Sequence, residues 1–164
     1  MKSLFIGGIK SGKSRLAEMF ILEQATEKPY YLATTEFYDD EMQARILIHQ
    51  QRRQDLFITL EEPVKLFKIL QTCTRPVLIE CVSMWLNNQL HYQIPEVDIL
   101  QELETLLQLP CDMVLVHNEV GLSVVADNRL ARQFVDLSGK AAQLMGQYCD
   151  QVFFCSAGLK MKMK

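Results

Sequence analysis

The sequence predicts an α/β fold in which a mostly parallel sheet carries helices on both faces. Three observations favour it. Short, strongly apolar runs recur along the chain, segments with helical periodicity lie between most of them, and a glycine-rich stretch directly follows the first run. With 164 residues, 49% of them hydrophobic, the chain is long enough to bury one core, so we expect a single domain over residues 1–164.

Five apolar runs are expected to form strands. Proline stands at the entry to three of them, as Pro29, Pro76 and Pro110, where the loss of a backbone N–H is tolerated. The expected strands are "SLFIG" (3–7), "YYLATT" (30–35), "PVLIEC" (76–81), "CDMVLVHN" (111–118) and "QVFFCSAG" (151–158), with "LFITL" (56–60) as a possible sixth. Helices between such strands imply parallel pairing.

The helical segments are indicated by proline and by periodicity. Pro63 and Pro95 precede "VKLFKIL" and "EVDILQELETLLQL", and proline suits the first turn of a helix. "RLAEMFILEQ" has the composition of a helix. The clearest pattern covers residues 127–149, where apolar residues recur every three or four positions and predict one buried stripe: Leu130, Phe134, Leu137, Ala141, Leu144 and Tyr148.

Composition and charge indicate which kinds of molecule the protein binds. The formal net charge is −3, from 17 basic and 20 acidic side chains, which gives no reason to expect a nucleic acid. No apolar run approaches the roughly 18 residues that span a membrane, and no secretory leader is recognisable, so we expect a cytoplasmic protein that binds small molecules. The five cysteines are odd in number and never form C-x-x-C, which argues for reduced thiols rather than disulfides or a zinc site.

Polar or very small residues end four of the predicted strands. In an open parallel sheet, ligands bind beyond the carboxyl ends of the strands, so these residues are expected at one edge. They are Thr34 and Thr35, Glu80, His117 with Asn118 and Glu119, and Ser156 with Ala157 and Gly158. Every strand must also leave the core somewhere, so a purely structural reading stays open for each of them.

The stretch "GGIKSGKS" matches the phosphate-binding pattern G-x-x-x-x-G-K-S between a predicted strand and a predicted helix. Glycines let backbone N–H groups surround a phosphate chain, Lys13 adds a positive charge, and Ser14 offers a hydroxyl to Mg²⁺. The start of the following helix adds its own partial positive charge. The expected nucleotide-binding residues here are Gly7, Gly8, Ile9, Lys10, Ser11, Gly12, Lys13 and Ser14.

A magnesium nucleotide also needs an acidic residue at the end of a neighbouring strand. Glu80 is the leading candidate because "PVLIEC" is strongly apolar, and Glu119 is the second. An unpaired buried carboxylate would be costly, so an acid at this place is hard to explain otherwise. We therefore expect Ser14 and Glu80 to hold the metal.

Charged residues recur every four positions in "DDEMQARILIHQQRR". Glu41, Arg45, His49 and Arg53 would line one face of a helix, which taken alone is typical of a solvated surface. The segment nevertheless follows Thr34 and Thr35 directly. The imidazole can therefore lie near a nucleotide, with the two guanidinium groups neutralising phosphate charge.

These segments together resemble a known family. The combination of "GGIKSGKSRLAE", "YLATTEFYDDEMQARILIHQ", "LIECVSMWLNNQL", "NEVGLSVVADNRLARQFVDLSGKAAQ" and "SAGLKMK" is similar to the bifunctional adenosylcobinamide kinase / adenosylcobinamide-phosphate guanylyltransferases of cobalamin biosynthesis, over nearly the whole chain. The resemblance implies a RecA-like P-loop NTPase fold and a homotrimer. It also implies that adenosylcobinamide is phosphorylated and then receives GMP from GTP through a guanylyl-histidine.

The resemblance assigns roles residue by residue. His49 falls on the family's histidine, with Lys13 as the other catalytic residue, and Glu80 falls on the strand-end acid, where aspartate is frequent in the family. The family's "NEVG" falls on residues 118–121. Mg²⁺ is the implied cofactor, and ATP and GTP are the implied nucleotides. Beyond the glycine-rich turn, the expected nucleotide-binding residues are Thr34, Thr35, Arg45, Arg53, Glu61 and Glu80.

Some positions depart from the family pattern, and two other functions stay open. Ala126 stands where a proline is common, and Ala142 and Gln143 stand where the family has an Asn-Gln pair, which affects expectations for corrinoid and subunit contacts. One alternative is another P-loop small-molecule kinase that never carries a covalent nucleotide. The other is a nucleotide-binding regulatory module that uses "ADNRLARQF" as a partner surface.

Overall fold

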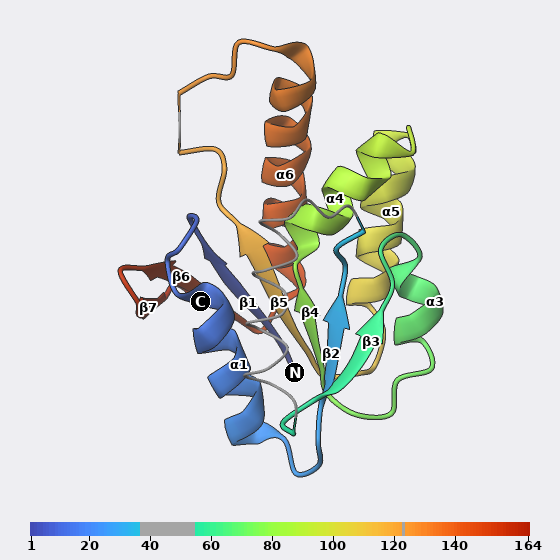
Figure 1. The fold of residues 1–164 in the computed structure, drawn as a ribbon, viewed down its shortest axis with the longest axis vertical. Coiled ribbons are helices and arrows are strands. Elements are labelled where there is room, and N and C mark those ends of the chain that lie inside the picture. Colours follow the sequence, from blue (N-terminus) through green and yellow to red (C-terminus); the bar gives the residue numbers. More distant parts are fainter. Residues whose placement is uncertain (37–54, 123) are drawn as a thin grey trace.

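The computed structural model describes residues 1–36, 55–122 and 124–164, and the strands in these residues form one sheet (Figure 1). The strand order is β3-β2-β4-β5-β1-β6-β7, with parallel pairing throughout except for β7, which is antiparallel to β6. The strands are β1 (Lys2–Gly7), β2 (Tyr30–Ala33), β3 (Ile58–Glu61), β4 (Val77–Glu80), β5 (Met113–Asn118), β6 (Gln151–Ser156) and β7 (Leu159–Lys162). The helices are α1 (Lys13–Gln24), α3 (Leu66–Leu70), α4 (Val82–His91), α5 (Glu96–Leu107) and α6 (Arg129–Tyr148).

The mostly parallel α/β fold predicted from the apolar runs is confirmed. All six expected runs contain a strand, including the possible sixth, which is β3. β7 was not anticipated. Its four residues alternate between apolar and lysine, all of them are exposed, and they add an antiparallel edge to an otherwise parallel sheet.

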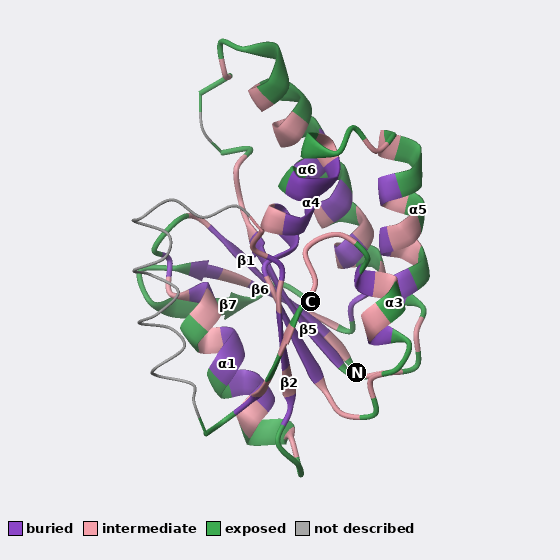
Figure 2. Ribbon diagram, turned by 45° about the vertical axis from the view of Figure 1, so that its right-hand side comes forward, coloured by how far each residue is buried: buried purple, intermediate pink, exposed green. Residues whose placement is uncertain are grey.

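In the part of the chain that the structure describes, helices cover both faces of the sheet. α1 packs on one face, where Phe5, Phe20 and Phe153 form a cluster of aromatic rings. α4, α5 and α6 pack on the other face around Trp85, which is fully buried. Figure 2 shows the buried residues concentrated in the strands and in the sides of the helices that face them. The sheet therefore separates two apolar clusters, and its strands contribute side chains to both of them.

The long helix α6 begins where a side chain caps it. Asn128 Oδ1 accepts a hydrogen bond from the Ala131 N–H at 2.8 Å, which satisfies one of the free donors of the first turn. Leu137 and Ala141 of the expected stripe are buried. The stripe was wrong at Leu130, which is 65% exposed, because the start of α6 projects beyond the sheet (Figures 1 and 2).

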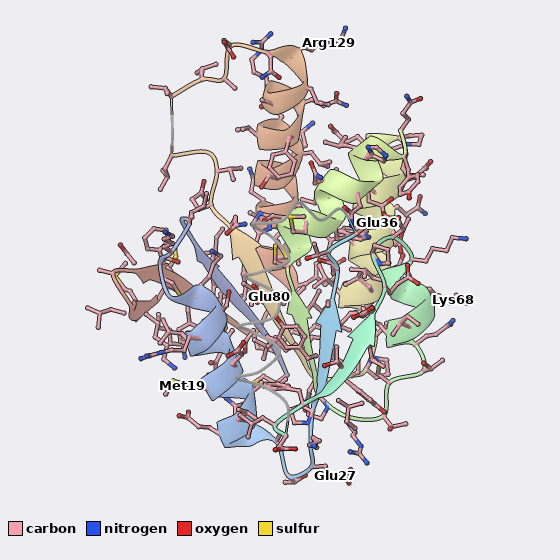
Figure 3. All side chains as sticks on the ribbon, in the orientation of Figure 1. Met19, Glu27, Glu36, Lys68, Glu80 and Arg129 are labelled. Atoms are coloured by element: carbon pink, nitrogen blue, oxygen red, sulfur yellow. The ribbon has the colours of Figure 1, made fainter. Side chains whose placement is uncertain are left out.

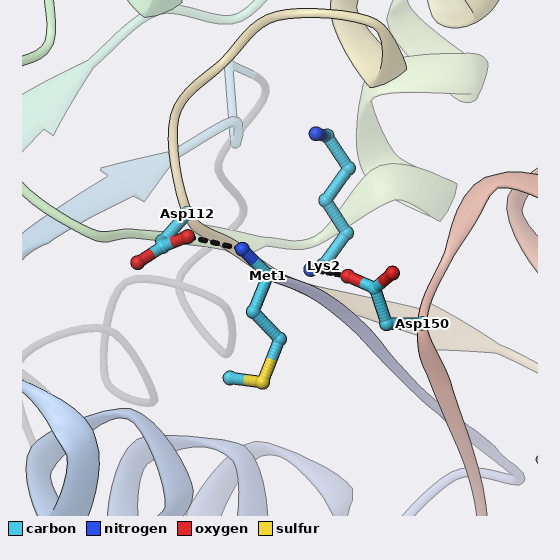
Figure 4. A network of polar contacts seen from close by, with 4 residues as sticks. All are labelled: Met1, Lys2, Asp112 and Asp150. Atoms are coloured by element: carbon cyan, nitrogen blue, oxygen red, sulfur yellow. Dashed lines mark hydrogen bonds and ion pairs between the residues drawn. The ribbon is translucent and has the colours of Figure 1, made fainter.

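Polar contacts fix the start of β1 at the edge of the sheet opposite the glycine-rich turn (Figure 4). The Met1 ammonium pairs with the Asp112 carboxylate, and the Lys2 N–H donates to Asp150 Oδ2 at 2.6 Å. The Met1 carbonyl accepts from the Met113 N–H at 3.0 Å. β1 pairs in parallel with both β5 and β6, so the carboxyl ends of all three strands lie at the same edge.

All five cysteines are free thiols. No helix in residues 1–36, 55–122 or 124–164 is long and apolar enough to cross a membrane.

Candidate active site

Two glycines of the turn between β1 and α1 occupy positions where a side chain does not fit. A Cβ at Gly7 would overlap the carbonyl oxygen of Cys155. Gly12 has φ of 91°, in the left-handed region, and a Cβ there would lie 2.9 Å from the Cα of Gly158. The backbone therefore approaches β6 at Gly7 and the β6–β7 turn at Gly12 more closely than any other residue type would allow.

The turn between β6 and β7 braces the glycine-rich turn. The Gly158 N–H donates to the Ser11 carbonyl at 2.9 Å, and both Ala157 and Gly158 have positive φ, at 52° and 77°. Residues 156–158, which the sequence placed at the carboxyl edge of the sheet, thus lie beside the phosphate-binding pattern. No local signal in the sequence shows this contact, which joins residues far apart in the chain.

The start of α1 presents hydrogen-bond donors and positive charge. Gly12 is the N-cap and provides no side chain, so no side chain caps the first N–H groups of the helix. The Lys13 side chain is 7% exposed, and its Nζ donates to the Gly8 carbonyl at 3.1 Å. An ammonium group has three donors, so this arrangement suits an anion that accepts the others.

The first residues of α1 meet the end of β4. Ser14 Oγ donates to Glu80 Oε1 at 2.7 Å, and Figure 3 shows Glu80 at the carboxyl end of β4, near the start of α1. Hydroxyl and carboxylate oxygens are ligands suited to Mg²⁺, which is often held by one or two carboxylates together with substrate phosphates. The pair that the sequence selected for the metal therefore lies together and fits that ion.

Glu119, the second candidate acid, is engaged within its own loop. Its Oε1 accepts the Gly121 N–H at 2.6 Å, and its backbone N–H donates to the Gly7 carbonyl at 3.0 Å. The backbone of Glu119 thus supports the glycine-rich turn. Its carboxylate has a local partner, which favours Glu80 for the metal.

Thr34 lies behind Glu80 and is fully buried. Its Oγ1 donates to the Cys81 carbonyl at 2.9 Å and accepts from the Cys81 N–H at 3.0 Å. It therefore holds the backbone at the end of β4. Thr35 follows it and is partly buried. Glu61 is exposed at the end of β3, which β2, β4 and β5 separate from β1, so the structure does not bring it to the glycine-rich turn.

A family model covers almost the whole chain. It is described as cobinamide kinase / cobinamide phosphate guanyltransferase and matches residues 3–163. The chain belongs to this family. It is therefore a transferase of that bifunctional class, and its glycine-rich turn carries the P-loop sequence pattern.

Similar proteins agree with the family assignment. The chain is 40% identical to the bifunctional adenosylcobalamin biosynthesis protein CobP of Pseudomonas aeruginosa, over 100% of this chain and 98% of that protein. It is 34% identical to the bifunctional adenosylcobalamin biosynthesis protein CobU of Escherichia coli, over 100% of both chains.

Solved structures support the fold alone. The flagellar accessory protein FlaH of Methanocaldococcus jannaschii matches with a TM-score of 0.55 at 10% identity, over 99% of this chain and 77% of that one. A KaiC-like protein of Pyrococcus horikoshii matches with a TM-score of 0.52 at 14% identity, over 93% of this chain and 69% of that one. Both share the fold of this chain over most of its length, which agrees with the predicted α/β class.

In this cobinamide kinase family member, polar residues of α4 support the end of β2. Asn88 Nδ2 donates to the Thr34 carbonyl at 2.7 Å and to the Pro63 carbonyl at 2.8 Å. Trp85 Nε1 donates to the Val64 carbonyl at 2.8 Å. The sequence reading gave these residues no role, although buried amides within the apolar "MWLNNQL" were a possible signal for such contacts.

The histidines differ in accessibility. His117 is 1% exposed, and burial lowers the pKa of its imidazole to about 4. Its ring nitrogens contact Ser83 Oγ at 3.1 Å and Ser138 Oγ at 2.9 Å, so it is enclosed between α4 and α6. His91 is exposed at the end of α4. The expected nucleophile His49, with Arg45 and Arg53, lies outside the described residues.

Proposed function

We propose that this enzyme phosphorylates adenosylcobinamide and then transfers GMP from GTP to adenosylcobinamide phosphate through a guanylyl-histidine on His49. Family membership supports the two activities. The observation that carries the nucleotide chemistry is the contact of Ser14 with Glu80 at the start of α1, beside the buried Lys13. This arrangement offers oxygen ligands and positive charge at one place.

In the kinase step, the hydroxyl oxygen of the aminopropanol group attacks the γ-phosphorus. The bond from that phosphorus to the bridging oxygen breaks, a nucleoside diphosphate leaves, and the hydroxyl proton is released. Lys13 and the first N–H groups of α1 stabilise negative charge on the phosphates. Ser14 and Glu80 would hold Mg²⁺, which supplies further charge neutralisation when it is bound.

In the second step, a neutral imidazole nitrogen of His49 attacks the α-phosphorus of GTP and pyrophosphate leaves. A phosphate oxygen of adenosylcobinamide phosphate then attacks the same phosphorus, which breaks the P–N bond and restores the imidazole. With an ordinary pKa near 6.5, imidazole is largely neutral at pH 7 and is a competent nucleophile. The burial of His117 supports His49 over that residue.

We also propose that the enzyme acts as a cytoplasmic homotrimer on small-molecule substrates. The resemblance to the family motivates the trimer. Exposed apolar side chains at Leu122, Val124, Val125 and Leu130 support a contact between subunits near the start of α6. Light scattering of the purified protein tests the trimer, and a monomer at micromolar concentration would contradict it.

GTP labelled at the α-phosphate tests the covalent intermediate. We expect the protein to retain label through a bond that is labile in acid and stable in alkali, with one pyrophosphate released per site. His49→Ala should abolish the label yet leave some phosphorylation of adenosylcobinamide, because that step needs no covalent nucleotide. His91→Ala and His117→Ala are the matched controls. If one of the controls loses the label while His49→Ala keeps it, the nucleophile is the histidine replaced in that control. If the wild-type protein takes up no label, the guanylyltransferase proposal is wrong and only the kinase activity remains proposed.

A further inference from the structure

The end of β5 carries a polar residue, Asn118, that the proposed mechanism does not use. β5 lies between β1, which leads into the P-loop, and β4, which ends at Glu80. The register pairs Asn118 with Gly7, the first residue of the phosphate-binding pattern. Asn118 therefore emerges from the sheet between the two parts of the proposed phosphate site.

Strand alternation places the Asn118 side chain on the same face as α1. Val114 and Val116 of β5 pack in the cluster on the α1 face, whereas Leu115 packs in the cluster on the opposite face. Asn118 continues the first series. Glu80 is on the α1 face as well, because it contacts Ser14. A side-chain amide and a carboxylate thus end adjacent strands on the face where α1 begins.

A buried serine fixes the backbone of Asn118. The pairing of β4 with β5 ends at Ile79 and Leu115, and beyond it the Asn118 N–H donates to Ser83 Oγ at 2.7 Å. Ser83 is 3% exposed, and its Oγ also contacts His117 Nδ1 at 3.1 Å. If Ser83 donates to Nδ1 and the imidazole donates through Nε2 to Ser138, every group in this chain of bonds is satisfied.

We propose that the Asn118 amide contacts the terminal phosphate of the bound nucleoside triphosphate, and that Ser83 is a positioning residue that holds Asn118 in place. The amide NH₂ donates to a phosphate oxygen, which adds to the charge stabilisation from Lys13 and the metal ligands. The role in catalysis rests on the proposed kinase reaction. The contact itself depends only on the binding of a triphosphate.

The binding of two nucleotides separates this role from a structural one. The test compares the Kd for a non-hydrolysable β,γ-imido ATP analogue with the Kd for ADP. We expect Asn118→Ala to raise the Kd for the analogue by about tenfold and the Kd for ADP by less than about twofold. The reason is that the variant loses a single hydrogen bond to a charged group of the terminal phosphate. Asn118→Asp, which has nearly the same volume, should weaken the analogue further by repelling the phosphate. Equal weakening of both nucleotides would overturn the contact.

Ser138 provides a matched control for Ser83. Each serine bonds to one nitrogen of His117, but only Ser83 also bonds to Asn118. Ser83→Ala should lower kcat for adenosylcobinamide phosphorylation by about fivefold or more and should also weaken the ATP analogue, because the Asn118 backbone loses its acceptor. Ser138→Ala should lower the melting temperature but change kcat by less than about twofold. Equal losses of kcat in the two variants would show that Ser83 is not a positioning residue.

A double variant tests whether Ser83 acts through Asn118. Ser83→Ala combined with Asn118→Ala should be no weaker in analogue binding than Asn118→Ala alone, because the effects of residues acting as a unit are not additive. Additive losses would overturn the proposed relationship. A wild-type enzyme that does not phosphorylate adenosylcobinamide would contradict the proposed function. The ratio of the two nucleotide affinities would still show whether Asn118 contacts the terminal phosphate, since the binding measurement requires no phosphoryl acceptor.

Discussion

Lys13 is 7% exposed, and within the described residues the hydrogen-bond partner of its ammonium is a single backbone carbonyl. A buried charge is costly unless it is paired and hydrogen-bonded. A bound phosphate chain supplies both the opposite charge and additional acceptors. Binding of a nucleotide at Lys13 and Ser14 would therefore offset the cost of burying the lysine charge.

We expect Lys13→Ala and Ser14→Ala each to lower nucleotide-dependent turnover by at least about tenfold, because each removes a charge or an oxygen ligand that the phosphates and metal use. The measurement is the steady-state rate of adenosylcobinamide phosphorylation at saturating substrate. Turnover at the wild-type rate in either variant would contradict the assignment of the P-loop.

Glu80 and Glu119 offer a comparison between two carboxylates. We expect Glu80→Gln to reduce turnover more than Glu119→Gln and to raise the Mg²⁺ concentration needed for half-maximal activity, because only Glu80 contacts Ser14. An amide at Glu119 can still accept from the Gly121 N–H. Titration of Mg²⁺ against activity decides the matter, and the opposite ranking would move the metal to Glu119.

Single residues of the site differed in how far the sequence predicted them. Gly12, Lys13 and Ser14 were found because the motif is local and its chemistry is fixed by spacing. The buried position of Thr34 was not predicted, because its partners are backbone atoms of residues 80 and 81. Contacts between distant segments leave no periodic signal in one sequence. The expected roles of Arg45, His49 and Arg53 remain predictions.

At the scale of elements, the conformation of the P-loop depends on contacts with β6 and the β6–β7 turn as well as on its own glycines. The β6–β7 turn bonds to Ser11 and leaves no space for a side chain at position 12, and Cys155 of β6 leaves none at position 7. Most strands were predictable because their apolar runs are short and buried, and proline precedes three of them. β7 was missed because all of its residues are exposed, so only a weak alternation marks it.

Alanine substitutions of glycine separate close approach from helix propensity. Gly12→Ala should destabilise the fold, because it forces positive φ on a residue with a Cβ and places that Cβ 2.9 Å from Gly158 Cα. Gly139→Ala, within α6 and with no atom inside 4 Å of the added Cβ, should stabilise by about 1 kcal/mol. Urea unfolding of both variants tests this, and a destabilised Gly139→Ala together with an unaffected Gly12→Ala would refute it.

At the scale of the whole molecule, the two apolar clusters share one sheet, since alternate residues of β1, β4 and β5 face opposite sides. Loss of either cluster removes support from the same strands. We therefore propose that residues 1–164 unfold as one cooperative domain. The stability of this core should depend on pH through His117, because its imidazole is enclosed between α4 and α6 as a neutral group.

The stability of the whole fold should decrease as pH falls from about 6.5 towards 4. Burial lowers the pKa of His117 to about 4, so below its unfolded pKa near 6.5 the unfolded chain binds a proton that the folded chain does not. The free energy of unfolding should fall by about 1 to 3 kcal/mol across this window. Urea unfolding at pH 7 and pH 5 measures the difference. His117→Gln should remove most of it, and a flat wild-type profile would exclude a buried neutral imidazole.

β7 ends the sheet with alternating leucine, lysine, methionine and lysine, and no other strand of the described residues pairs with its outer edge. Such an edge can template pairing with strands of other molecules, and lysine on an edge strand opposes this through charge and hydration. We therefore expect Lys160 and Lys162 to oppose such pairing, although the Lys160 ammonium also lies over the ring of Phe20 at 5.2 Å. Chemical acetylation would remove this protection, so an acetylated preparation should form β-rich aggregates at concentrations where the unmodified protein stays in solution.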